Sequence, residues 1–425
     1  MQVLLVATTT GYQTRAFGDA AARLGIELVF ATDRCHVLED PWLDSAIPVR
    51  FHDIPASVAR VVEAARTRPF DGVVAVGDRP AVLAAHIQEA LGLPGHPPDA
   101  AAAARHKLHT RERLRDAGLH VPQFVVAPLS TDASALSGHV TYPAVLKPVS
   151  LSGSRGVMRV DSDTQLRASV DRLRALLGRP DIRSERDAAH DLVILEEFIA
   201  GHEFAVEAIM NDGQLHALAI FDKPDPLDGP FFEETIYITP PALTTTCADE
   251  IVSAVTAAAR AIGLHHGPVH AECRVSDAGV FVLEAAARPI GGLCARALRF
   301  HKAGSADAIG LEELLLRHAI GERSDQWTRE RVGSGVMMIP IPARGLYRGV
   351  VGVEAALDTP HVCDLQITAK PGQVLVPLPE GASYLGFIFA RAADGSAVDR
   401  ALRDAHAALA FTVDPQVPVL QSAHG

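Results

Sequence analysis

The chain has 425 residues, too many for one ordinary hydrophobic core, so its length predicts two or three domains. Its formal net charge of −12 disfavours a nucleic-acid surface, which needs clustered Lys and Arg side chains. No apolar run reaches the roughly 18 residues that a membrane span needs. We therefore expect a cytoplasmic protein that acts on small molecules and binds neither nucleic acid nor membrane.

The cysteines form no CxxC pair, which argues against a zinc site and a disulfide framework and favours reduced thiols that pack the interior. They stand at Cys35, Cys247, Cys273, Cys294 and Cys363.

The first part of the chain alternates short apolar runs with Ala-rich helical patterns. The runs cover residues 3–7, 27–31 and 72–76, and this alternation predicts parallel βαβ units. We expect an open, Rossmann-like α/β domain over residues 1–103. The GxGxxG fingerprint is absent, which disfavours a dinucleotide site there.

Two further domains are expected after a Pro- and Gly-rich boundary near residue 100. Residues 104–322 should form a mixed α+β domain that carries the chemistry, with a lid over about 122–197. From residue 323 to residue 425, short β-type runs separated by Pro and Gly predict a small β-rich C-terminal domain.

The segment YPAVLKPVSLSGSRGV predicts a strand, a loop and a return strand, with Lys147 at the end of the first strand. One ammonium and several backbone amides of a Ser/Gly loop can bind a polyphosphate. This is no P-loop, because GxxxxGK[ST] is missing and the lysine precedes the loop. An ordinary hairpin with a surface lysine is the alternative. The loop residues expected at phosphate are Ser152, Gly153, Ser154 and Gly156.

The segment VILEEFIAGHEFAVEAI places Glu196 and Glu197 in an otherwise apolar strand before a turn. Buried carboxylates need partners, and adenine offers one. Backbone groups of Glu197 and Ile199 could bond the base, while Glu203 suits ribose hydroxyls. The alternative is an exposed strand edge that carries glutamates against aggregation.

The segment GPVHAECRVSDAGVFVLEAAARP predicts a hairpin across an SDAG turn, with Glu272 on one strand and Glu284 on the other. Two inward carboxylates repel each other unless a cation lies between them, and Mg²⁺ fits that need. Arg288 could then hold a phosphate. Two solvated acids on an ordinary hairpin are the alternative. His270 shares the strand face of Glu272 and is expected to touch a ligand.

The other histidines of this region match neither HExxH nor a zinc spacing. Structural or substrate-side roles are expected for them: His202, His216, His265 and His266.

Taken in order, Lys107, the Lys147 strand with its SGSRG loop, the EEFIAGHE turn and the ExxxR run from Glu284 resemble the ATP-grasp superfamily. The strings FDKPDPLDGPFFEETIYITP and LEAAARPIGGLCARALRF resemble its L-amino acid ligases. The resemblance implies an ATP-dependent ligase that activates a carboxylate as an acyl-phosphate and joins it to an amine, releasing ADP and phosphate. A carboxylase or purine-synthesis type of ATP-grasp enzyme and an inactive nucleotide-binding module are the alternatives.

The resemblance also implies ATP and Mg²⁺, with Mn²⁺ as a substitute, and a homodimer. The residues it assigns fall into four groups. Catalytic roles fall on Lys147, Glu284 and Arg288. ATP contacts fall on Lys107, Lys147, the loop residues, Glu196, Glu197, Ile199 and Glu203. Metal contacts fall on Glu272 and Glu284. Substrate contacts fall on Lys223, Glu233 with its neighbour Glu234, His270, Gly291 and Gly292, although the first three also fit a surface loop rich in Pro and Asp. Ala286 departs from the pattern, because many members carry Asn there.

Overall fold

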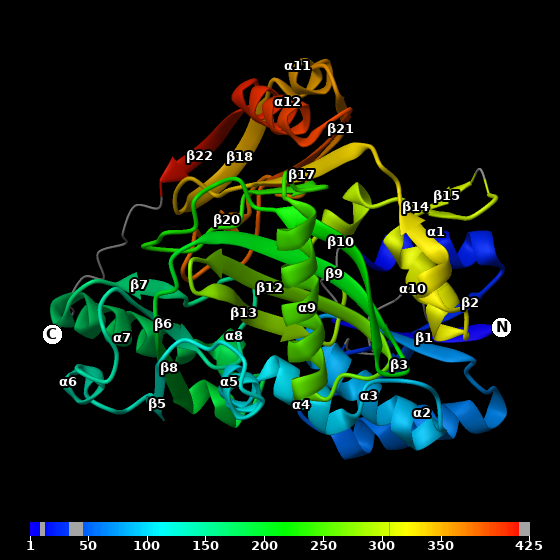
Figure 1. Ribbon diagram of the computed structural model, residues 1–425, viewed down its shortest axis with the longest axis horizontal. Coiled ribbons are helices and arrows are strands. Elements are labelled where there is room, and N and C mark those ends of the chain that lie inside the picture. Colours follow the sequence, from blue (N-terminus) through cyan, green and yellow to red (C-terminus); the bar gives the residue numbers. More distant parts are fainter. Residues whose placement is uncertain (9–12, 34–45, 306, 416–425) are drawn as a thin grey trace, which may run out of the picture.

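A computed structural model describes residues 1–8, 13–33, 46–305 and 307–415 (Figure 1). Cys35 lies outside the described residues. The other four cysteines form no disulfide in the described part of the chain, and Cys273 and Cys294 are buried as expected.

The N-terminal part is a parallel sheet of four strands in the order β3-β2-β1-β4. Its strands are β1 (Gln2–Ala7), β2 (Glu27–Thr32), β3 (Ala46–Pro48) and β4 (Gly72–Val76). Strand β1 is buried along its whole length, as in sheets covered on both faces. One face packs against α1 (Thr14–Leu24), the other against α2 (Ile54–Thr67) and α3 (Asp78–Leu91). The predicted Rossmann-like arrangement is confirmed.

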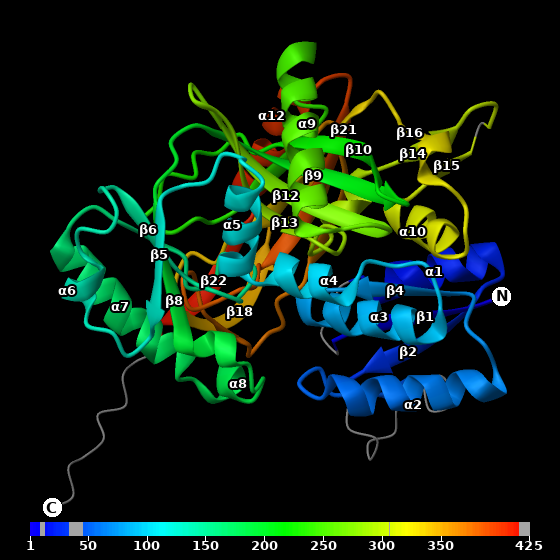
Figure 2. The same cartoon turned by 60° about the horizontal axis from the view of Figure 1, so that its bottom comes forward.

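Helices α4 (Pro98–Arg105) and α5 (Lys107–Asp116) lead into an antiparallel sheet in the order β5-β8-β6-β7 (Figure 2). Its elements are β5 (Phe124–Pro128), α6 (Ala133–Leu136), β6 (Ala144–Pro148), β7 (Met158–Val160), α7 (Asp163–Leu177), α8 (Pro180–Arg183), η1 (Ala188–Asp191) and β8 (Leu192–Glu197). Helix α7 starts at the Ser162 cap and buries Leu166, Val170 and Leu173 at helical spacing. This small layer, which we call the lid, lies at one side of the molecule.

The largest sheet has eight strands in the order β13-β12-β9-β10-β11-β17-β21-β19, each antiparallel to its neighbours. The strands are β9 (His202–Asn211), β10 (Gln214–Asp222), β11 (Ile236–Thr239), β12 (Gly267–Ser276), β13 (Gly279–Ala286), β17 (Gly333–Ile339), β19 (Val362–Ile367) and β21 (Gly386–Ala392). Helix α9 (Thr245–Ile262) packs on β12 and β13, and α12 (Gly395–Ala407) packs on β17 and β21. The sheet continues across residue 322, so the predicted domain boundary there stays a prediction.

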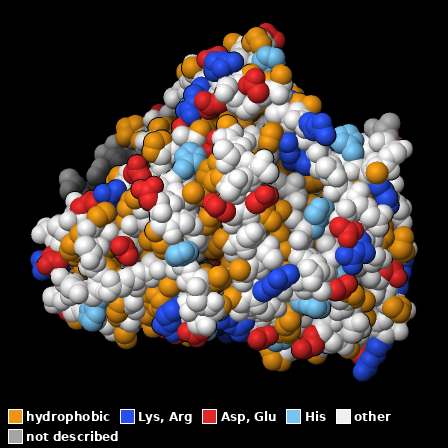
Figure 3. All heavy atoms as spheres, in the orientation of Figure 1, with side chains coloured by type: hydrophobic (Ala, Val, Ile, Leu, Met, Phe, Trp, Pro, Cys, Tyr) orange, Lys and Arg blue, Asp and Glu red, His pale blue; other side chains and the backbone are white. Residues whose placement is uncertain are grey.

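Smaller elements complete the described fold. They are η2 (Cys294–Ala297), β14 (Phe300–Lys302), β15 (Ala308–Ile309), α10 (Leu311–Ala319), η3 (Ser324–Gln326), β16 (Trp327–Arg329), β18 (Gly345–Val351), α11 (Val353–Leu357), β20 (Val374–Leu375) and β22 (Ala410–Pro415). Acidic and basic side chains are interspersed over the face shown in Figure 3. None of the described helices combines the length and the apolar character that crossing a bilayer requires.

Candidate active site

A cavity of about 450 Å³ lies where the lid, the large sheet and the carboxyl edge of the N-terminal sheet meet. A volume of this size suits small-molecule ligands. The residues that the sequence proposed from four separate segments come together here. Those lining the cavity are Lys107, Lys147, Ser152, Gly153, Ser154, Glu196, Glu197, Ile199, Glu203, His270, Glu272, Glu284, Arg288, Gly291 and Gly292.

Three of the proposed residues do not line the cavity: Gly156, Lys223 and Glu233. Gly156 has a φ of +77°, and a Cβ there would lie 3.0 Å from Leu173, so this glycine shapes the lid loop. Glu233 is half-buried outside the lining, and its neighbour Glu234 lines the cavity instead.

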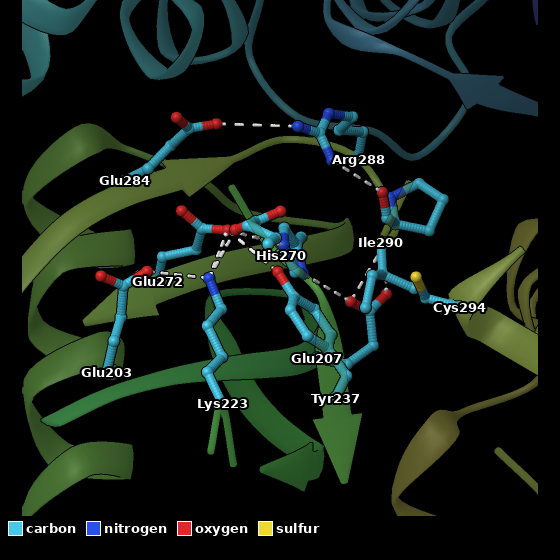
Figure 4. A network of polar contacts seen from close by, with 12 residues as sticks. Glu203, Glu207, Lys223, Tyr237, His270, Glu272, Glu284, Arg288, Ile290 and Cys294 are labelled. Carbon is cyan, nitrogen blue, oxygen red and sulfur yellow. Dashed lines mark hydrogen bonds and ion pairs between the residues drawn. The ribbon is translucent and has the colours of Figure 1, made fainter. Parts of the chain in front are cut away.

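Lys223 is buried directly beneath the cavity, where its ammonium contacts three carboxylates (Figure 4). Its Nζ donates to Glu203 at 2.8 Å, Glu234 at 2.6 Å and Glu272 at 3.0 Å. Burial opposes the charge, but the three acids raise the pKa of Lys223 well above its usual value. Its expected direct contact with substrate is therefore corrected: this lysine holds acids that line the cavity.

The three acids around Lys223 share their negative charge unequally. Burial and the charge of Glu272 raise the pKa of Glu234 to about 7, although Lys223 opposes the shift. Burial would also raise the pKa of Glu272, but Lys223 and His270 hold it well below its usual value. Carboxylate oxygens of Glu203, Glu234 and Glu272 lie within 4.8 Å of one another. The cluster is thus a second set of oxygen donors that can attract a cation.

Glu272 and Glu284 are direct partners across the β12–β13 hairpin, and both line the cavity as expected. Each carboxylate nevertheless has a basic side chain of the protein beside it. The ammonium of Lys223 donates to Glu272, and a guanidinium nitrogen of Arg288 lies 3.6 Å from Glu284. The cation that this pair was expected to need is thus supplied in part by the protein itself, and the magnesium assignment stays a prediction. Ala286 is buried opposite His270 in the same register.

Arg288 connects the hairpin to the N-terminal sheet. Its Nε donates to Asp78, the first residue of α3, at 2.7 Å, and Nη1 donates to the carbonyl of Pro289. Burial would lower the pKa of Arg288, but Asp78 and Glu284 raise it further above its already high value. Two acids already contact the guanidinium of Arg288, so only its remaining N–H groups are left for the phosphate that it was expected to hold.

Glu196 is paired with two basic side chains of the protein, whereas the sequence suggested adenine as its partner. Its carboxylate is buried between the guanidinium of Arg111 on α5, at 2.8 Å, and the ammonium of Lys147. Burial would raise the pKa of Glu196, but these two cations lower it to about 2. The N–H of Glu197 donates to the carbonyl of Gln123. The triad thus ties α5 to the lid and holds Lys147 at the cavity wall.

His270 belongs to a hydrogen-bonded chain that includes Glu207, a residue the sequence argument missed (Figure 4). The Nδ1 of His270 lies 3.1 Å from Glu207, and Glu207 also accepts from the N–H of Ile290 at 3.1 Å. Burial would lower the pKa of His270, but hydrogen bonds to Glu207 and Glu272 raise it to about 9. Glu207, like Glu196, is a carboxylate within an apolar run of its strand, so the same pattern indicates that it needs a partner.

The imidazolium of His270 gives stability a pH dependence. An unfolded histidine has a pKa of about 6.5, so this stabilisation is full below pH 6.5 and is lost as pH rises through 9. We expect wild type to lose about 3 kcal/mol more unfolding free energy than His270→Gln between pH 6.5 and 9.5. Denaturant unfolding at both pH values measures this difference in unfolding free energy. The surface variant His139→Gln should follow wild type, and equal slopes for His270→Gln and wild type would contradict the assignment.

The lid loop contacts the C-terminal part of the chain through the turn at Pro379 and Glu380. The N–H of Gly156 donates to Pro379 at 2.8 Å, and Arg155 Nε donates to the Glu380 carbonyl at 2.9 Å. On α7, Arg172 Nη2 donates to the Glu380 carboxylate at 3.0 Å. These contacts fasten the lid over the cavity, and we call them the Glu380 latch.

Comparisons with known proteins agree with this arrangement. Residues 140–297 match the ATP-grasp domain, residues 18–95 the ATP-grasp N-terminal domain, and residues 337–414 the L-amino acid ligase C-terminal domain 2. A crystal structure of L-amino acid ligase from Bacillus licheniformis is 28% identical with a TM-score of 0.81, covering 98% of this chain and 99% of that one.

Curated proteins are also similar to the chain. An uncharacterised protein of Sinorhizobium fredii is 26% identical over 97% of this chain and 84% of its own length. Carnosine synthase 1 of Gallus gallus is 30% identical over 53% of this chain, which spans only 25% of that enzyme. The chain belongs to the ATP-grasp superfamily. Within it, the protein is an ATP-dependent ligase that forms carbon–nitrogen bonds.

Proposed function

We propose that the protein joins the carboxylate of one amino acid to the amine of another, through an acyl-phosphate, with release of ADP and phosphate. The proposal is supported by the likeness to an L-amino acid ligase over nearly the whole of both chains. The observation that carries it is that two lysines suited to bind phosphate, Lys107 and Lys147, line the same cavity as the paired carboxylates of the β12–β13 hairpin. Domain limits of 1–103, 104–322 and 323–425 remain part of the proposal.

The lid side of the cavity is proposed to bind ATP. Lys147, held by Glu196, and Lys107, whose Nζ donates to the carbonyl of Leu151 at 2.7 Å, present two ammonium groups to the phosphates. In the loop between β6 and β7, Gly153 and Ser154 adopt φ values of +64° and +53°. Residues 153–156 form a turn, and backbone amides of a turn can bind an anion. Glu197 and Ile199 border the cavity at the strand end, where we place the base.

Glu272 and Glu284 are proposed to hold Mg²⁺. The fit rests on donor chemistry, since the two carboxylates face one cavity and offer the hard oxygen ligands that Mg²⁺ prefers. When bound, the ion offsets charge on the nucleotide phosphates. Lys223 fixes the position of Glu272 and limits the charge of the acid cluster around it. Mn²⁺ is expected to substitute.

The residues at the other end of the cavity are proposed to act on the acyl group. Arg288, oriented by Asp78, offers its remaining N–H donors to the transferring phosphoryl group. Gly291 and Gly292 line the cavity, and no group in the described part of the chain accepts a hydrogen bond from either N–H. Those amides can therefore stabilise an oxyanion on the acyl carbon. Glu234, with its pKa near 7, is suited to accept a proton from the attacking ammonium.

The test is a phosphate-release screen over pairs of amino acids with MgATP, followed by mass spectrometry of the products. The proposal predicts phosphate release that needs both amino acids, together with a product whose mass equals their sum less one water. Phosphate release that requires bicarbonate and no amino acid would contradict it and favour carboxylase-type chemistry.

The Glu380 latch provides a second test, because an acyl-phosphate reached by water is hydrolysed. We expect Glu380→Ala to lower the yield of amide per phosphate released several-fold, since the lid opens more often. The pair with Arg172 is partly exposed, so the change should cost less than about 1 kcal/mol of stability. Measuring amide and phosphate in one reaction gives the ratio. The exposed variant Glu354→Ala should keep the wild-type ratio, and a normal ratio in Glu380→Ala would exclude a latching role for the Glu380 carboxylate and its pair with Arg172.

A further inference from the structure

Gln13, the residue before α1, is a buried polar side chain in the wall of the cavity that the mechanism above does not use. Only 3% of it is exposed. Its Nε2 donates to the carbonyl of Ile290, across the boundary between the N-terminal sheet and the β12–β13 hairpin. Its Oε1 is buried with no hydrogen-bond partner among the residues that the structure describes.

The contact with Ile290 determines which atom of the Gln13 amide lacks a hydrogen-bond partner. A backbone carbonyl can only accept, so the amide nitrogen must face Ile290 and the oxygen must face away. The N–H of Ile290 donates to Glu207, so hydrogen bonds hold this residue through both its N–H and its carbonyl. A buried acceptor without a donor lowers stability, and a ligand N–H would remove that cost.

The charges around Gln13 favour a cationic donor. Ile290 is two residues from Arg288, and the acids in this chain of contacts are Asp78, Glu207, Glu272 and Glu284, against the cations Arg288, His270 and Lys223. Four carboxylates face three cations, and Glu272 shares one of these, Lys223, with Glu203 and Glu234, so negative charge is in surplus at this end of the cavity. An ammonium group fits such a place better than a second carboxylate.

We propose that Gln13 Oε1 accepts a hydrogen bond from the α-ammonium group of the acyl-donor amino acid. This inference rests on the proposed ligase function. The carboxylate of the acyl donor must reach the phosphoryl group beside Arg288, which brings its α-amino group near Ile290 and Gln13. A neutral amide oxygen binds an ammonium without taking its proton. It therefore suits the amino group that stays protonated, whereas the attacking amine has to lose its proton.

Gln13 is thus a specificity residue contributed by the start of α1. It would distinguish α-amino acids from carboxylic acids of the same shape that lack the amino group. A hydrogen bond to a charged group corresponds to roughly tenfold to a hundredfold in kcat/KM.

The test compares the acyl donor found in the screen with its analogue that lacks the α-amino group. We expect wild type to prefer the amino acid by at least about tenfold in kcat/KM, and Gln13→Met to bring this ratio close to one. The KM for MgATP should not change. The Tm of Gln13→Met should stay equal or rise, because the variant no longer buries an unpartnered acceptor. Gln13→Asn, which withdraws the same amide by one methylene, should also lower the ratio.

Gln88→Met is the matched control. Gln88 also donates its Nε2 to a backbone carbonyl, that of Val73, in the same sheet region but outside this cavity. Its variant should keep the wild-type ratio. An unchanged ratio in Gln13→Met, or a preferred acyl donor without an amino group, would overturn the inference while the ligase function stands. If wild type joins no pair of amino acids, the proposed function fails and the inference fails with it.

Discussion

Replacement of Lys223 by Met is expected to destabilise the protein by about 3–5 kcal/mol, because the variant buries three carboxylates without their shared ammonium. The side chain of Lys223 is 3% exposed, so solvent offers little screening. Glu234, whose pKa is already about 7, can take up a proton and relieve the repulsion at low pH. The loss should therefore be smaller at pH 5.5 than at pH 8. Urea unfolding of wild type and variant at both pH values measures this loss of unfolding free energy.

A matched control is Lys302→Met. Lys302 pairs with Glu322 at the surface, so its loss should cost less than about 1 kcal/mol at either pH. Similar costs for the two lysine variants would contradict the view that Lys223 organises the acids of the site.

Glu284→Gln is expected to lower kcat by about 1000-fold while the protein stays folded. The substitution keeps the shape of the side chain and removes one of the two charges proposed to hold Mg²⁺. Among the described residues, the substitution weakens only a 3.6 Å contact with Arg288, so the unfolding free energy should change by less than about 1 kcal/mol. Coupled phosphate release and thermal unfolding measure the two effects.

Asp277→Asn tests whether any charge loss in this hairpin has the same effect. Asp277 is exposed in the turn between β12 and β13, and its variant should retain wild-type turnover. Nearly full activity in Glu284→Gln, or equal losses in the two variants, would remove Glu284 from the proposed metal site.

Local patterns predicted the elements that carry the cavity. The strand with Lys147, its Ser/Gly loop and the Glu272–Glu284 hairpin all occur where the sequence placed them, because each depends on alternation and turn residues within about twenty positions. Helix α12 was missed, and the region was read as β-rich. Its buried positions, Val398, Ala401, Leu402 and Ala405, do repeat at helical spacing, so the signal was present.

The partners of the buried charges could not be predicted in this way. Arg111 and Glu196 are 85 residues apart, and Gln13 and Ile290 are 277 residues apart. No local pattern relates positions at such separations, since packing of the lid, the sheets and the helices brings them together. The sequence therefore indicated that Glu196 needed a partner but assigned that role to adenine. The resemblance placed Lys223 at the substrate, and no local pattern showed that two of its acids, Glu203 on β9 and Glu272 on β12, come from other strands.

An isotope label can decide whether the carboxylate of one substrate is phosphorylated before the amine attacks. The acyl donor is prepared with ¹⁸O in both carboxylate oxygens, and the phosphate released with amide formation is analysed by mass spectrometry. Attack of the amine on an acyl-phosphate leaves one carboxylate oxygen on the phosphate, so we expect one ¹⁸O in each phosphate. Amide formation with unlabelled phosphate would contradict it.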